Sequence, residues 1–248
     1  MKTLGIFGDS WVDPSHGHDL DPSIAQHAWS CHLNKHYQID LHALKGNSLY
    51  WAYQKFLEHH KKYDHCIFIV TSLGRYSRNG VLGLGGQRYL VPNYETGEYL
   101  LSKPDFDLKK KNRIQALMGY YLFLQDDQHD LAMARLMIGK VRELRPDAII
   151  VPIWQHGDGF LNELVPLSEY RRLMFNSIDP AQTQKMIDGS WNYTEIRCVC
   201  HVSVEINKLI AENMQQALEL GVWNPQIPKY IEHPHVLDYY YELSGKSK

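Results

Sequence analysis

The residue types that could carry out a reaction stand at opposite ends of this 248-residue chain. An apolar run at residues 2–7 leads directly into Asp9 and Ser10, and His201 comes just before a helical stretch opened by Ser203. A hydroxyl at the carboxyl end of a parallel strand lies where open α/β sheets bind ligands. A histidine held at a helix entrance can take its proton, so Ser10 is the candidate nucleophile and His201 the candidate base. The alternative for Asp9 and Ser10 is turn chemistry, in which both side chains bond their own backbone.

Two further strands are predicted to end in small or polar residues at the same edge. The run 38–44 leads into Gly46, just before a helix, and the apolar run 65–71 leads into Gly74 and Arg75. A backbone N–H at a strand-to-helix junction can face a negative charge, which makes Gly46 a candidate for binding one. Gly46 is equally well explained as a glycine that only the turn requires.

A fourth predicted strand, 148–153, is followed by Gln155 and His156 at the same edge. These two residues, with Asp9 and Trp11 on either side of the candidate nucleophile, are candidates for contacting a substrate. The alternative for His156 is a structural histidine.

Helical patterns separate these strands, as in an α/β fold. Pro22 is predicted to begin a helix capped by Asp21, with Ala25, Trp29 and Leu33 along one face. A second stripe predicts core packing on a later helix: Ala134, Met137, Val141 and Leu144.

Two segments depart from this alternation. Residues 77–104 are rich in glycine and contain a predicted hairpin, so we interpret them as an inserted flap. Three roles stay open for this flap: selecting substrates, forming a plain surface feature, and making an oligomer contact. The tail at 222–248 is rich in Pro, His and Tyr and is predicted to pack irregularly.

Length and composition indicate one soluble domain. The apolar fraction is 44%, the net charge is −2 and the isoelectric point is near 6.7, so nothing favours binding to nucleic acid or to an anionic membrane. We expect no signal peptide, since Asp9 interrupts the early apolar run, and no membrane helix, which would need about 20 apolar residues. A cytoplasmic protein is predicted.

The four cysteines and fourteen histidines do not predict a metal site. The cysteines are expected to be free thiols in a reducing compartment. Cys198, Cys200 and His201 are close in sequence, but no second pair of ligands at finger spacing accompanies them.

With these residues in place, the chain resembles the SGNH hydrolases, the GDSL-like lipase/acylhydrolase superfamily. Phe7-Gly8-Asp9-Ser10 resembles the first block of that family, and Gly46 has the spacing of the second block's oxyanion glycine. His201, followed by the run 209–212, resembles the last block. The resemblance covers residues 3 to about 215 apart from the flap. It implies a flavodoxin-like, three-layer α/β/α sandwich with a mainly parallel sheet of about five strands, and no metal or organic cofactor.

Two positions differ from the family pattern. The third block normally carries an asparagine that donates to the oxyanion, but residues 72–75 contain none. Gly74, Arg75 or Gln155 could supply that donor. The family's aspartate, three residues before the histidine, is replaced by Cys198, which leaves Glu195 or a backbone carbonyl to orient the imidazole.

The resemblance implies a serine esterase or acylhydrolase that works through an acyl-enzyme. We expect a small ester as substrate, and an O-acetylated carbohydrate in view of the aromatic residues at the edge. Two alternatives stay open: a catalytically weakened module that binds a glycan or a protein, and an acyltransferase. An oligomer formed through the flap or the tail is compatible with each of them.

Overall fold

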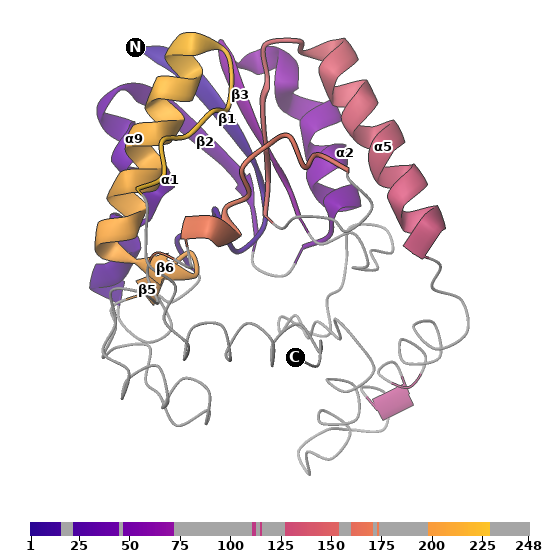
Figure 1. Ribbon diagram of the computed structural model, residues 1–248, viewed down its shortest axis with the longest axis horizontal. Helices are drawn as coiled ribbons and strands as arrows, with labels where there is room; N and C mark the ends of the chain where they lie inside the picture. Colours follow the sequence, from indigo (N-terminus) through magenta and orange to yellow (C-terminus); the bar gives the residue numbers. More distant parts are fainter. Residues whose placement is uncertain are drawn as a thin grey trace.

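The computed structural model describes residues 1–15, 22–44, 47–71, 111–112, 115, 127–153, 160–170, 173 and 198–228. This part of the chain has a mixed α/β fold built on a parallel four-stranded sheet with the order β2-β1-β3-β4 (Figure 1). The strands are β1 (Lys2–Gly8), β2 (Tyr37–Ala43), β3 (His65–Val70) and β4 (Ile149–Pro152). Each strand lies on one of the four runs predicted from the sequence.

The side chains of the central strand β1 alternate between the two faces of the sheet. Leu4 and Ile6 belong to the core on one face, and Phe7 belongs to the core on the other. All three are fully buried, as expected for a parallel strand covered on both sides. Because β1 ends at Gly8, opposite Ala43 of β2, the residues that follow it lie at the carboxyl edge of the sheet.

Two pairs of helices cover these faces (Figure 1). On the Leu4 side lie α1 (Trp29–His32) and α9 (Val204–Leu220), and on the Phe7 side lie α2 (Leu49–His59) and α5 (Asp127–Leu144). The predicted stripe of α5 is confirmed, because Ala134, Met137 and Val141 are buried and Leu144 packs against them.

Serine side chains begin two of these helices. The Ser48 hydroxyl accepts from the N–H of Trp51 at the start of α2, and the Ser203 hydroxyl accepts from the N–H of Ile206 at the start of α9. Helix α9 ends at Gly221, whose φ of 72° is a left-handed conformation that glycine adopts without steric cost. The predicted start and end of α9 are therefore confirmed.

The prediction of one continuous helix from Pro22 onward is wrong. The segment forms a 3-10 helix η1, then α1, then a 3-10 helix η2, with bounds Pro22–His27, Trp29–His32 and Leu33–Lys35. Ala28 is extended, with a ψ of 141°, and this break leaves the N–H of Trp29 free to donate to Oδ1 of Asn207 at 2.9 Å. A contact from another part of the chain thus overrides the helical pattern. Trp29 and Leu33 are buried as predicted, whereas Asp21 lies outside the described residues.

At the amino edge of the sheet, Arg145 connects the turn after α5 to the segment before β3. Its guanidinium donates to the backbone carbonyls of His60, Tyr63 and Asp64 at 2.8, 2.9 and 2.9 Å. It also pairs with both carboxylate oxygens of Asp147, at 2.8 and 2.7 Å. Hydrogen bonding to Arg145 holds the pKa of Asp147 below its usual value.

The ring of Tyr63 lies directly against Gly5. A Cβ at position 5 would be 2.2 Å from Cδ2 of that ring, so this approach requires glycine. The Tyr63 hydroxyl donates to Oδ2 of Asp40 at 2.8 Å and lies 2.7 Å from Nε2 of His42. The His42 ring also stacks on His59 with centroids 4.4 Å apart, and burial lowers the pKa of His42 to about 4.

Candidate functional site

The nucleophile and base candidates meet at the carboxyl edge of the sheet. Oγ of Ser10 lies 2.8 Å from Nε2 of His201, which is 191 positions away in the sequence. Ser10 is 5% exposed, and His201 is half-buried. With the ring proton on Nδ1, the hydroxyl donates to Nε2, which is the arrangement of a nucleophile with its general base. The structure thus brings together the two residues that the sequence singled out.

A tight turn directly after β1 presents the Ser10 hydroxyl. The backbone oxygen of Asp9 accepts from the N–H groups of Val12 and Asp13, both at 3.0 Å. Oδ1 of Asp9 accepts from the N–H of Trp11 at 3.1 Å. Because Asp9 is fully buried, its carboxylate stabilises the turn from inside the protein.

Helix α1 anchors the loop that follows the nucleophile. Nε1–H of Trp29 donates to the backbone oxygen of Trp11 at 2.6 Å, and the Ser30 hydroxyl donates to that of Val12 at 3.0 Å. The side chain of Trp11 is 2% exposed, and its ring centroid lies 5.0 Å from that of His201 with the planes tilted by 30°. Trp11 therefore forms a packed wall beside the imidazole and restricts its rotation.

His201 lies in the turn of a small hairpin just before α9. Strands β5 (Cys198–Val199) and β6 (Val202–Ser203) pair antiparallel, and Cys200 and His201 connect them. Both connecting residues have left-handed φ angles, 51° and 69°. This pattern is typical of a type I′ turn, which favours Asn-Gly. For other residues the left-handed region costs about 1–2 kcal/mol each, and such strain is often found at functional sites.

The thiol of Cys200 supports this turn from inside. Cys200 is fully buried, and Sγ lies 3.7 Å from the backbone oxygen of Asp13, to which the thiol donates. Burial raises the pKa of the Cys200 thiol well above its ordinary value, so the thiol is neutral near pH 7. Within the described ranges, no group of three or more His, Cys, Asp or Glu residues is placed to hold a metal ion.

Asn207, in the first turn of α9, is a residue of this site that the sequence analysis missed. It is fully buried, and its Nδ2 donates to the backbone oxygens of Val199, Val202 and Ser203 at 2.9, 3.1 and 3.0 Å. The sequence did contain a signal. Asn207 stands three positions before Ile210 on the apolar face of α9, where a polar amide is unexpected unless it has hydrogen-bond partners.

Other predicted site residues lie outside the part of the chain that the structure describes. They are Gly46, Gly74, Arg75, Gln155, His156 and Glu195. Cys198 is placed in β5 by its backbone alone, and the flap at 77–104 and the tail beyond Pro228 also lie outside. The roles of these residues as oxyanion donors or orienting groups therefore stay predictions.

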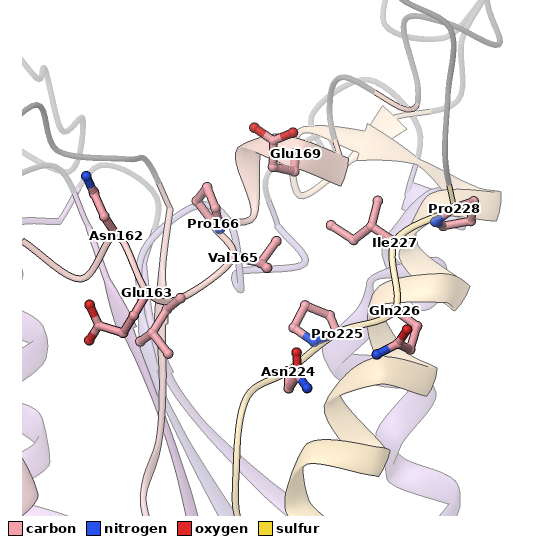
Figure 2. A pocket seen from close by; sticks show the side chains of 11 residues that line it. Asn162, Glu163, Val165, Pro166, Glu169, Asn224, Pro225, Gln226, Ile227 and Pro228 are labelled. Atoms are coloured by element: carbon pink, nitrogen blue, oxygen red, sulfur yellow. The ribbon is translucent and has the colours of Figure 1, made fainter. Parts of the chain in front are cut away.

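A separate groove of about 730 Å³ lies between residues 162–169 and 224–228 (Figure 2). Figure 2 shows Val165 and Ile227 facing one another across it. The residues that line the groove include neither the nucleophile nor the base. The groove and the Ser10–His201 pair are therefore distinct features of the surface.

A comparison with protein-family models, curated proteins and solved structures finds no match for this chain. Among the described residues, no helix is both long enough and apolar enough to cross a membrane.

Proposed function

We propose that this chain is a serine hydrolase of the SGNH type that cleaves small esters. The observation that carries the proposal is the 2.8 Å contact between Oγ of Ser10 and Nε2 of His201. The contact lies where the parallel strands end, which is where open α/β sheets bind ligands. The neighbouring thiol, Cys200, is buried and neutral, so Ser10 is the better nucleophile of the two.

The arrangement of strands and helices supports this family. The order β2-β1-β3-β4 agrees with the first four strands of the flavodoxin-like order 2-1-3-4-5. Helices pack on both faces of the described sheet. We infer that the complete fold is a three-layer α/β/α sandwich with about five strands.

In the proposed reaction, Nε2 of His201 takes the hydroxyl proton of Ser10, and the oxygen attacks the ester carbonyl. The N–H groups of Ser10 and Gly46 stabilise the oxyanion, and Gly74 or Arg75 supplies a further donor. The imidazolium then gives its proton to the leaving alcohol, and the acyl group stays on Oγ. A water molecule that the same histidine deprotonates attacks the acyl-enzyme and releases the acid.

Two parts of this proposal concern residues beyond the catalytic pair. Glu195 or a backbone carbonyl accepts from Nδ1–H of His201 and fixes the tautomer, since Cys198 stands where the family has an aspartate. The substrate class is an O-acetylated carbohydrate, because Trp154 and His156 come shortly after β4 in the sequence and flat rings of this kind pack against sugars.

A non-catalytic module that binds a glycan or a protein is the second candidate. It is favoured by one observation, the absence of an asparagine from residues 72–75. Loss of one oxyanion donor lowers kcat by about 10²- to 10³-fold, so a chain without a substitute donor would be a very slow enzyme.

Hydrolysis of p-nitrophenyl acetate, with labelling of the nucleophile by a fluorophosphonate, tests the proposal. Ser10→Ala should abolish labelling and turnover, and His201→Ala should reduce both by about 10³-fold or more. Ser15→Ala and His36→Ala are matched controls, because both side chains are exposed and lie outside the pair. Labelling that survives in Ser10→Ala would refute the proposal. A folded wild type that is neither labelled nor active would favour the binding module.

A further inference from the structure

We infer that Asn207 is the positioning residue that holds His201 in line with Ser10. This inference rests on the proposed function for its kinetic consequence, but its geometric content stands apart from any reaction. The fully buried amide of Asn207 bonds the turn that carries the base directly, and it supports the loop that carries the nucleophile through α1. All four hydrogen bonds of the Asn207 side chain are buried.

The first connection is to the turn that carries the base. The three carbonyls that accept from Nδ2 of Asn207 belong to Val199, Val202 and Ser203, so they bracket Cys200 and His201 on both sides. Both bracketed residues are left-handed, a combination typical of a type I′ turn and unfavourable for residues other than Gly, Asn and Asp. Without the amide, each of the three carbonyls would lose one donor, so the turn would be free to relax and the imidazole would move with it.

The second connection runs through α1 to the loop that carries the nucleophile. Oδ1 of Asn207 accepts from the N–H of Trp29 at 2.9 Å, where Ala28 has no side chain that could cap α1. Trp29 and the next residue, Ser30, in turn donate to the backbone oxygens just after the nucleophile, those of Trp11 and Val12. One amide is therefore shared between the supports of both reacting groups.

The orientation of this amide is fixed by its partners. The oxygen faces an N–H donor, and the nitrogen faces three carbonyl acceptors, so a flipped amide would place like groups against one another. A misplacement of about 1 Å in a catalytic group can lower the rate by about 10²-fold. Loss of Asn207 should therefore lower kcat and leave KM nearly unchanged.

The test compares Asn207→Ala with Asn213→Ala. Asn213 is a matched control, because it is a buried asparagine of the same helix that also bonds backbone groups, those of Leu209 and Gln226, away from the catalytic pair. Asn207→Ala should lower kcat and the rate of fluorophosphonate labelling by about 10²-fold, and Asn213→Ala should change neither by more than about threefold.

A second variant separates positioning from stability. Ala28→Ser, added to Asn207→Ala, gives α1 a capping hydroxyl for the N–H of Ser30 or Cys31 and so stabilises the helix by another route. The double variant should regain part of the lost Tm but not the lost kcat, because the turn of His201 still lacks its donor. Recovery of kcat together with Tm would overturn the inference. Asn207→Ser, whose hydroxyl can still donate to the backbone oxygen of Ser203, is measured in parallel and should show the same loss of kcat if the alanine variant does not fold.

An activity-independent measurement distinguishes failure of this inference from failure of the proposed function. The Trp11 ring lies beside the imidazole of His201, so its ring current should displace the Cε1–H resonance of His201 in a ¹³C-histidine NMR spectrum. His201→Ala assigns that signal. In Asn207→Ala it should move toward the free-histidine position, while the signal of His60, which stacks on Phe56, should stay.

The two readouts give distinct outcomes. If the wild type is unreactive but the His201 signal moves in Asn207→Ala, the positioning role of Asn207 stands and the hydrolase is refuted. A His201 signal that stays in place in Asn207→Ala would overturn the inference, whether or not Ser10 reacts.

Discussion

The two edges of the sheet are each held by one planar side chain that donates to three backbone carbonyls. At the amino edge Arg145 donates to His60, Tyr63 and Asp64, and at the carboxyl edge Asn207 donates to Val199, Val202 and Ser203. We call each of these side chains, with the three carbonyls that it bonds, a clamp. The two clamps differ in charge and in surroundings. Arg145 is ion-paired with Asp147 and its side chain is 15% exposed, whereas Asn207 is neutral and fully buried.

Because of this difference, we expect Arg145 to contribute to the stability of the fold and Asn207 to the geometry of the candidate site. The residues joined by Arg145 all have negative φ angles, so that clamp stabilises an unstrained connection. The clamp formed by Asn207 encloses two left-handed residues, one of which is the candidate base. Strained backbone persists only where its surroundings determine it strongly. The amino edge should therefore tolerate loss of its clamp without loss of reactivity, and the carboxyl edge should not.

The largest effect on folding is expected from Arg145→Met. Three carbonyls and Asp147 would lose a charged donor, so the free energy of unfolding should fall by about 3 kcal/mol. Urea unfolding measures this loss, and fluorophosphonate labelling of the variant, while folded, should proceed at the wild-type rate. Arg145→Lys is the control and should recover part of the stability. Slower labelling of folded Arg145→Met would show that the two edges are coupled.

A second effect comes from acid and depends on His42, near the carboxyl end of β2. Its pKa of about 4 in the folded protein lies below the ordinary 6.5, so the unfolded chain binds the proton more readily and stability falls as the pH drops from about 6.5 toward 4. At pH 5 the loss is at most about 2 kcal/mol, and solvent reaches the half-buried ring and reduces it.

The control for this effect is the variant His42→Gln. Burial also lowers the pKa values of His32, His60 and His65, so several histidines contribute to the pH dependence of the wild type. The difference between wild type and His42→Gln, measured by urea unfolding at pH 7 and pH 5, isolates the part from His42. Identical slopes in the two proteins would contradict the prediction.

The smallest effect is expected from the helix caps. Ser48→Ala and Ser203→Ala should each lower the free energy of unfolding by about 1 kcal/mol, because each removes the acceptor for one N–H at a helix start. Only Ser203 adjoins the turn of His201, so only Ser203→Ala should also slow labelling. Equal labelling rates in the two variants would mean that the turn is insensitive to the start of α9.

Local patterns were sufficient to predict much of this fold. Apolar runs placed the four strands, and Ser203 and Gly221 placed the two ends of α9. The same patterns failed where a distant residue decides the backbone. The break at Ala28 depends on an acceptor from Asn207, 178 positions beyond Trp29, and the left-handed turn at Cys200 and His201 contains no glycine that would have indicated it.

The residues of the candidate site also fall into those that the sequence predicts and one that it does not. Residue type and position between a strand and a helix were enough to single out Ser10 and His201. The place of Asn207 on the apolar face of α9 indicates only a buried amide with partners. Its role could not be predicted, because those partners are backbone groups, which have no sequence signature. The turn role of Asp9, by contrast, was one of the two alternatives that the sequence itself offered.

The contact between Gly5 and Tyr63 has a consequence for the evolution of this chain. Any side chain at position 5 would occupy the space of the tyrosine ring, and a smaller residue at position 63 would leave Asp40 and His42 without their shared hydroxyl. Substitutions at these positions should therefore covary among homologues. Glycine at 5 with tyrosine at 63 would mark a descendant of this fold even where Ser10 has been lost.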